Sequence, residues 1–126
     1  MGLMSALTGN ASEISVDSIQ EEVGPLLAPG ESITKAYKMI RDYFVFTTSR
    51  LILIDKQGVT GKKTEFHIIP YRSITSYKIE TAGYGIDDSE LKIYVHGEDD
   101  PITKEFNKSI DIAELQIALA TQMFKD

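Results

Sequence analysis

The sequence predicts a mainly β protein: a seven-stranded, bent antiparallel sheet that forms a partly open barrel and is capped by a C-terminal α-helix. Seven short apolar segments separated by turn residues follow one another between residues 31 and 108, and a helical stripe follows them. Another helical stripe precedes the strands and predicts an N-terminal helix. The 126 residues are expected to form one domain. Its parts are an N-terminal arm and helix over 1–30, the sheet over 31–108 and the capping helix over 109–126.

The N-terminal helix is predicted by apolar residues that recur mostly three or four positions apart. They are Val16, Ile19, Val23, Leu26 and Leu27. This spacing places the side chains on one face of an α-helix. Either Ser15 with Asp17 or Ser18 with Glu21 can cap its start, because their side-chain oxygens can accept from free N–H groups. The segment 24–25, Gly followed by Pro, is expected to end the regular part of the helix.

Seven strands are expected next, each bounded by residues that favour turns. Their ranges are 31–40, 42–48, 50–56, 63–69, 73–81, 90–96 and 101–107. In the sixth, Leu91, Ile93 and Val95 alternate with Lys92 and Tyr94, which is typical of a strand with one buried face.

A second helical stripe closes the chain and predicts the C-terminal helix. It consists of Ile112, Leu115, Ala118 and Leu119. Asp111 with Glu114 resembles an Asp-headed capping box at its start. An antiparallel unit of seven strands followed by one amphipathic helix indicates a curved sheet whose open end or corner the helix plugs.

The second and third strands, within FVFTTSRLILID at 44–55, are apolar on both faces. In the second strand Phe44 and Phe46 oppose Tyr43 and Val45, and in the third Leu51 and Leu53 oppose Ile52 and Ile54. One set fills the barrel, and the other must be covered by the N-terminal helix, by the arm, or by a second copy of the protein. A short helix covers only part of such a surface, and large apolar patches are uncommon on monomers. We therefore expect a homo-oligomer, and the candidate interface residues are Phe44, Phe46, Leu51 and Leu53.

The charge and composition exclude several kinds of partner. Nineteen acidic and thirteen basic residues give a net charge of −6, which opposes binding to nucleic acid and disfavours binding to anionic lipid surfaces. The chain has no cysteine, which excludes disulfides and thiolate metal sites and fits a reducing cytoplasm. Its apolar runs are too short to span a bilayer. These observations predict a cytoplasmic protein.

The segment KQGVTGKKT at 56–64 is the candidate ligand-binding turn, although it fails the Walker pattern. That pattern needs glycine at the position of Lys56 and Ser or Thr at the position of Lys63. A hairpin turn with exposed lysines is the simpler interpretation. The alternative is an anion site in which Lys56, Lys62 and Lys63 act together with backbone amides of the glycine-rich turn.

The remaining polar residues indicate structure rather than chemistry. His67 and His96 fall in different strands without neighbouring ligands, so the sequence predicts no metal site and no cofactor. No catalytic residue is identified, and an enzyme is not expected. Three cations in and after the first strand, together with Arg50, are expected to form structural ion pairs. The three are Lys35, Lys38 and Arg41; Arg41 precedes Asp42, and Arg50 and Asp55 lie at the two ends of one strand.

The run IRDYFVFTTSRLILIDKQGVTGKKTEFHIIPYRSI, with ETAGYGIDDSELKIYV after it, resembles the bacterial pleckstrin-homology domain family of small stand-alone proteins. The resemblance extends over essentially the whole chain. It implies a seven-stranded, strongly bent antiparallel sheet with a C-terminal helix, and an additional N-terminal helix. It also implies self-association into ring-shaped homo-oligomers. The basic cluster of phosphoinositide-binding relatives is reduced here to Lys35, Lys38 and Arg41, followed by Asp42.

Together these observations predict a non-enzymatic domain that assembles with itself and presents a surface to another protein or peptide. The alternative is a peripheral binder of lipid or phosphate headgroups that uses the lysine-bearing turn.

Overall fold

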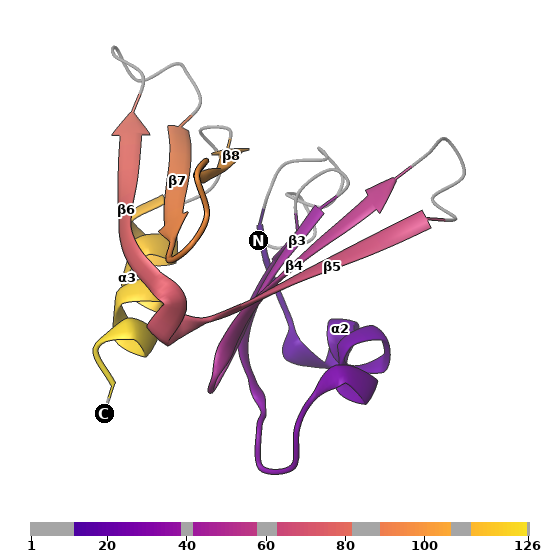
Figure 1. The fold of residues 1–126 in the computed structure, drawn as a ribbon. Coiled ribbons are helices and arrows are strands. Elements are labelled where there is room, and N and C mark those ends of the chain that lie inside the picture. Colours follow the sequence, from indigo (N-terminus) through magenta and orange to yellow (C-terminus); the bar gives the residue numbers. More distant parts are fainter. Residues whose placement is uncertain (1–11, 39–41, 58–62, 82–88, 107–111, 126) are drawn as a thin grey trace.

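The structure is a computed structural model that describes residues 12–38, 42–57, 63–81, 89–106 and 112–125. Within these ranges it contains two antiparallel β-sheets and two α-helices (Figure 1). The first sheet has the strand order β1-β2-β3-β4-β5. Its strands are β1 (Ser12–Ile14), β2 (Ile33–Lys38), β3 (Asp42–Thr47), β4 (Arg50–Gln57) and β5 (Lys63–Pro70).

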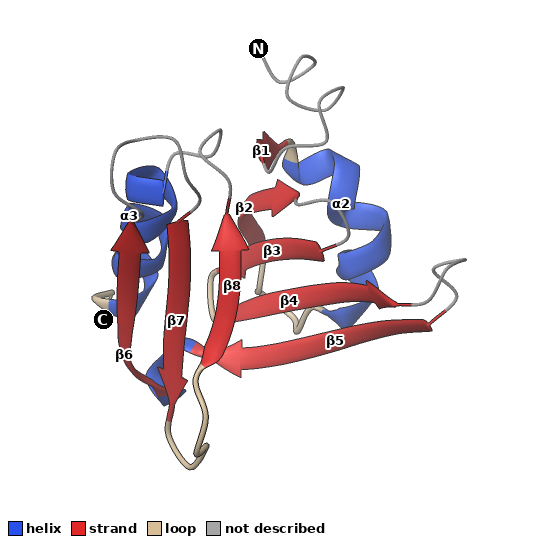
Figure 2. Ribbon diagram, turned by 90° about the horizontal axis from the view of Figure 1, so that it is seen from above, coloured by secondary structure: helices blue, strands red, loops and turns tan. Residues whose placement is uncertain are grey.

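The second sheet has the strand order β6-β7-β8. Its strands are β6 (Ile74–Thr81), β7 (Ser89–Val95) and β8 (Ile102–Phe106). The short 3-10 helix η2 (Tyr71–Ser73) leads the chain from the first sheet into the second. Seen from above, the strands of the second sheet run across those of the first (Figure 2).

The two α-helices lie on different sides of the first sheet. The helix α2 (Val16–Val23), followed by the 3-10 turn η1 (Gly24–Leu26), covers the face that points away from the second sheet (Figure 1). The helix α3 (Ile112–Met123) lies beside the second sheet and contributes Leu115 and Leu119 to the core between the sheets.

All seven predicted strands are present, and the mainly β class with a C-terminal helix is confirmed. Two features differ from the prediction. The three-residue strand β1 was not expected, because so short a segment shows no readable alternation. The strands also form two sheets instead of one continuous sheet, since η2 separates β5 from β6.

The start of α2 shows which of the two predicted caps is used. The Ser15 side chain accepts from the backbone N–H of Ser18 at 3.3 Å, and Asp17 lies in the first turn, where its charge suits the helix dipole. After Val23 the chain tightens into the 3-10 turn that contains Pro25, which has no N–H to continue the α-helix. The predicted C-terminal cap Asp111 lies outside the described residues.

The apolar faces of β3 and β4 belong to two separate cores. The inner core lies between the sheets and includes Phe44, Phe46, Leu51 and Leu53 from this hairpin. The outer core lies under α2, where Ile19 and Val23 pack against β2, β3 and β4; its sheet residues are Ile33, Ala36, Val45, Ile52 and Ile54. Full burial of one such aliphatic side chain stabilises the fold by about 1.5–3 kcal/mol. Both faces of the hairpin are therefore covered within one chain.

This arrangement corrects the proposed interface residues. Phe44 and Leu51 have no exposed surface, and Phe46 and Leu53 are 1% and 4% exposed. All four side chains fill the inner core, so they have no surface to offer to a second copy. The helix α2 buries Val45, Ile52 and Ile54 on the opposite face more completely than its length suggested.

An aromatic contact joins the two sheets through the inner core. The rings of Phe44 on β3 and Phe106 on β8 are 5.3 Å apart in an edge-to-face arrangement. Within the first sheet, the rings of Tyr37 on β2 and Phe46 on β3 are 6.1 Å apart in a similar arrangement. Such pairs add about 0.5–1.5 kcal/mol beyond the area that they bury. The Phe44–Phe106 contact therefore helps to hold β8 over the first sheet.

Candidate functional site

A surface groove lies between the first half of β2 and one side of α3. It has a volume of about 200 Å³. Its lining residues are Thr34, Lys35, Glu114, Ile117, Ala118, Thr121 and Gln122. We call it the α3 groove.

The helical wall of the α3 groove follows from the 3.6-residue period. Positions 114, 117, 118, 121 and 122 lie on one face of α3, whereas Leu115 and Leu119 lie on the face that enters the inner core. Ile117 is 59% exposed. The wall is therefore apolar at its middle and open to solvent.

The strand wall of the groove is formed at an irregularity in β2. The pairing with β3 shifts between Ile33 and Lys35, so that Thr34 is an extra residue. A bulge breaks the strict alternation of side chains, and here both Thr34 and Lys35 line the groove. The Thr34 hydroxyl donates to the carbonyl of Phe46 at 3.0 Å, which fixes the bulged residue to β3.

One end of the groove is charged. The Lys35 ammonium lies 3.4 Å from a carboxylate oxygen of Glu13 on β1 and 3.9 Å from one of Glu114 on α3. The Tyr37 hydroxyl donates to Glu114 at 3.2 Å. All three ionic side chains are 39–46% exposed, so the cluster positions β1 and α3 against β2 at little net free energy.

A buried acceptor lies along the same groove. The Oε1 atom of Gln122 is shielded from solvent and has no hydrogen-bond partner among the residues that the structure describes. An unpaired buried acceptor costs about 1–3 kcal/mol. Because solvent does not reach this atom, it represents a cost to the fold and not a contact that the groove offers.

The lysine-bearing turn is only partly in the described region. Lys56 lies 2.9 Å from Glu22 of α2, and its ammonium lies 5.7 Å from the ring centre of Tyr43. Lys63 begins β5 and is exposed, whereas Lys62 lies outside the described residues. The structure thus gives Lys56 a structural contact between sheet and helix, and it brings Lys56 and Lys63 to the same end of the β4–β5 hairpin.

The expectation of ion pairs is met for Lys35, which is paired as above. For Lys38 the contact found is of another kind, because its ammonium lies 6.0 Å from the ring centre of Tyr43. Arg41 lies outside the described residues. The pairing of Arg50 is structural, as expected, but its partner is Glu31 and not Asp55.

The Arg50–Glu31 pair is the most enclosed ionic contact found in the described residues. Two guanidinium nitrogens of Arg50 donate to the two carboxylate oxygens of Glu31, at 2.9 and 2.6 Å, and a further donation at 2.9 Å reaches the carbonyl of Leu26. The hydroxyl of Thr47 also donates to Glu31. The Glu31 side chain is only 2% exposed. Bonds from Arg50, the largest contribution, lower the pKa of Glu31 to about 2.

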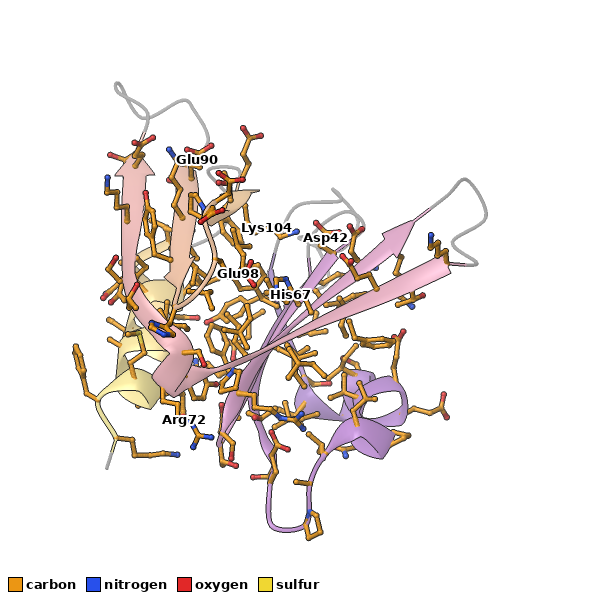
Figure 3. All side chains as sticks on the ribbon, viewed as in Figure 1. Asp42, His67, Arg72, Glu90, Glu98 and Lys104 are labelled. Atoms are coloured by element: carbon orange, nitrogen blue, oxygen red, sulfur yellow. The ribbon has the colours of Figure 1, made fainter. Side chains whose placement is uncertain are left out.

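Asp42 lies between the two sheets, and its pKa shifts in the direction opposite to that of Glu31. Its neighbour across the β3–β4 ladder is Asp55, and Lys104 on β8 lies 3.6 Å away. In Figure 3 the labelled side chains of Asp42 and Lys104 lie beside one another across the space between the sheets. Burial, together with the charge of Asp55, raises the pKa of Asp42 above its usual value despite the attraction of Lys104.

These two carboxylates predict a pH dependence of stability. The pKa of Glu31 is lower in the folded state than in the unfolded state, so its contribution is complete above about pH 4.5 and is lost as the pH falls toward 2. A shift of the Glu31 pKa from 4.5 to about 2 corresponds to about 3 kcal/mol of unfolding free energy. Asp42 has the opposite effect on the pH dependence of stability, because its pKa is raised in the folded state and its contribution is lost as the pH rises. Urea unfolding of the Asp42→Asn variant at pH 7 and pH 2.5 measures the Glu31 contribution without that opposing effect.

The double variant Asp42→Asn, Arg50→Met is the control for this experiment. Without the guanidinium, Glu31 loses the main cause of its low pKa, so the loss of stability between pH 7 and pH 2.5 should shrink by about 3 kcal/mol. Equal pH dependence in the two backgrounds would contradict the assignment to Glu31.

Among the residues that the structure describes, the remaining polar side chains form no recognisable cluster of ligands. Neither a cluster of three potential metal ligands nor a helix long and apolar enough to cross a membrane is found within the described ranges. His67 lies on β5, and His96 follows β7, where its backbone N–H donates to Ser73.

Sequence reasoning missed the α3 groove, although part of the signal was present. Ile117, Thr121 and Gln122 lie outside the apolar stripe that predicts α3. Ile117 and Thr121 are four residues apart, which indicates a second face of the same helix. Nothing local to these residues indicates that β2 lies opposite them.

Comparisons with known proteins agree with this fold. The family model described as Bacterial PH domain matches residues 2–123. The uncharacterized protein YjqA of Bacillus subtilis (strain 168) is 50% identical over 121 residues, which cover 95% of this chain and 97% of that protein. YozO of the same organism, also uncharacterized, is 29% identical over 110 residues, 87% of this chain and 94% of its own.

Two crystal structures are similar over nearly the whole chain. A DUF1696 family protein with a pleckstrin-homology domain from Shewanella loihica PV-4 has a TM-score of 0.83 and 46% identity, and it covers 92% of this chain and 99% of its own. A pleckstrin homology domain from Shewanella amazonensis SB2B has a TM-score of 0.83 and 45% identity, with 98% and 100% covered. The chain belongs to the bacterial PH domain family.

Proposed function

We propose that this protein is a non-enzymatic binding and assembly domain that associates with itself into a closed ring and presents a surface to another protein or peptide. The polar groups of the described residues support this proposal, because their closest contacts are ion pairs and hydrogen bonds within the fold. Such contacts stabilise structure and do not resemble a nucleophile with its base.

The single observation that carries self-association is the unpaired edge of β5. This strand is eight residues long and pairs on one side only, with β4, among the strands that the structure describes. It also carries Ile68, a residue that is 37% exposed. A long edge with free backbone groups is a template for pairing with another chain unless it is protected.

A ring requires each copy to offer one surface and receive another. The outer strand β6 of the second sheet also lacks a partner on one side among the described strands. Two different edges per copy permit head-to-tail contacts, which close into a ring when the rotation between copies is suitable.

Replacing Ile68 with lysine is expected to dissociate the assembly and leave the fold intact. The substitution places a charge at the centre of the proposed contact, and loss of such a residue weakens an interface by about tenfold or more. Size exclusion with light scattering should give a multiple of 14.0 kDa for the wild type and the monomer mass for Ile68→Lys.

The matched control is Gln20→Lys, which adds the same charge at an exposed position of the helix α2 and not on a sheet edge. It should assemble like the wild type, and all three proteins should give the same β-rich circular dichroism. A wild type that remains monomeric at high micromolar concentration would refute self-association. Assembly that survives Ile68→Lys would exclude β5 as the contact.

A further inference from the structure

The helix α3 has a second apolar stripe, apart from the one that enters the inner core. Leu115 and Leu119 are buried in that core, whereas Ile117 and Phe124 are exposed. The members of the second stripe, in chain order, are Ala113, Ile117, Ala120 and Phe124. The backbone N–H of Phe124 donates to the carbonyl of Ala120 at 2.9 Å, so the helical spacing continues to the end of the stripe. We call these four residues the α3 stripe.

The α3 stripe is open to solvent although it is apolar. Three large hydrophobic residues are exposed in the part of the chain that the structure describes, and two of them belong to the stripe: Ile117, at 59%, and Phe124, at 78%. Figure 1 shows α3 at the opposite edge of the molecule from α2. Exposed apolar side chains that gather on one face indicate an interaction site, whereas scattered ones do not.

The order of small and large residues makes the α3 stripe complementary to its own reverse. Read in either direction, the spacings are four, three and four residues. A second stripe that runs antiparallel therefore places Ile117 opposite Ala120 and Phe124 opposite Ala113. Alternating large and small residues at facing positions allow two helices to interdigitate. A parallel arrangement would instead place each large side chain against its own copy.

This self-complementarity favours a second copy of the chain as the partner. A contact across a two-fold axis uses the same surface patch on both copies. The α3 stripe meets this requirement within one helix, because its spacing and its order of sizes both match under reversal. A different protein or an apolar ligand would require neither match.

We propose that α3 pairs antiparallel with α3 of a second copy across a two-fold axis, with Ile117 of each copy over Ala120 of the other. This contact goes beyond the proposed ring, whose contacts are head-to-tail. Standard interfaces have about 20–30 residues on each side, so four residues form a weak contact between single copies. In the proposed ring all copies carry the same stripe, and the contacts then act together to join two rings.

The pairing predicts distances that a disulfide can report. The chain has no cysteine, so an introduced one has no competitor within its own copy. Packed helices have axes about 8–10 Å apart, and their Cα atoms lie about 2.3 Å from each axis. Facing Cα atoms are therefore about 3.5–5.5 Å apart, which overlaps the range of about 4.4–6.8 Å that disulfides span.

The test mixes two full-length single-cysteine proteins, Ile117→Cys and Ala120→Cys, both in the Ile68→Lys background. That background removes the proposed β5 contact, so the result does not depend on ring formation. After equilibration at high micromolar concentration in a glutathione redox buffer, intact mass spectrometry should show a mixed disulfide dimer of twice 14.0 kDa. Both Phe124 side chains and one Ile117 remain in this dimer to hold the pair.

The control mixture combines Ile117→Cys with Ala113→Cys in the same background. Position 113 faces Phe124 of the other copy, which lies seven residues, or about 10 Å, along the helix from position 117 of that copy. At least fivefold less mixed dimer is expected. Adding Phe124→Glu to both proteins of the first mixture should also lower the yield at least fivefold, and circular dichroism should show that every variant is folded.

The outcomes separate this inference from the proposed ring. Equal yields from the two mixtures, or a yield that Phe124→Glu does not change, would overturn the α3 pairing. Light scattering of the wild type tests the ring. A ring without the mixed dimer would refute the α3 contact alone. A monomeric wild type whose variants give the mixed dimer in the expected register would refute the ring and support the α3 contact.

Discussion

The Arg50→Met variant is expected to lose about 3–5 kcal/mol of unfolding free energy at pH 7. The substitution keeps an unbranched side chain but removes both guanidinium donors to Glu31, whose side chain is 2% exposed. The charge then remains buried with Thr47 and the backbone N–H of Ala28 as donors. The bond to the carbonyl of Leu26 is also lost, so the turn before β2 is no longer tied to β4. Urea unfolding measures the loss.

The matched control is Lys56→Met. Lys56 and Glu22 form an ion pair at a similar distance, 2.9 Å, but both side chains are about one third exposed. The expected loss is below about 1 kcal/mol, because water replaces the lost partner. Similar losses for the two variants would mean that burial of Glu31 does not determine the contribution of its partner.

The Val23→Asp variant is expected to lose about 4 kcal/mol or more. Val23 has no exposed surface and contacts the outer core beneath α2. An aspartate there removes the aliphatic contact and buries a carboxyl group with no basic residue in that core. To hydrate the carboxyl group, the end of α2 must separate from the sheet, which exposes Val45, Ile52 and Ile54. Thermal unfolding and binding of a hydrophobic dye should both report the change.

The control for this variant is Gln20→Asp, which has the same change in charge at an exposed position of the same helix. It should change stability by less than about 0.5 kcal/mol. If Val23→Asp is equally mild, α2 does not contribute to the stability of the sheet, and the apolar outer face must be covered in another way.

The strands and helices could be predicted because their signals are local. Alternation, helical spacing and the turn residues that separate them are all within short segments, as the stripe of Ile19 and Val23 shows. The serine cap at Ser15 is equally local. β1 lacks such a signal, because three residues are recognisable as a strand only by their pairing with β2.

The contacts between distant residues could not be predicted in the same way. Arg50 and Asp55 are close in sequence, but five residues of strand separate them by about 17 Å; Glu31, nineteen residues earlier, becomes the partner through the fold. The sequence indicated two apolar faces on β3 and β4 but left their covers undecided among the helix, the arm and a second copy. The α3 groove depends likewise on the packing of the last helix against the first long strand.

The strands β3 and β4 contribute side chains to both cores. Loss of the inner core and loss of the outer core therefore have different consequences for the rest of the fold. If the contacts of the inner core are lost, the surface on which α2 rests is lost with them. The reverse does not hold, because α2 can leave while the aromatic and aliphatic contacts between the sheets remain. Local unfolding is therefore expected to begin with α2, which can leave the sheet and return while the contacts between the two sheets persist. Release of α2 therefore lowers the stability of the sheet but leaves the contacts of the inner core in place.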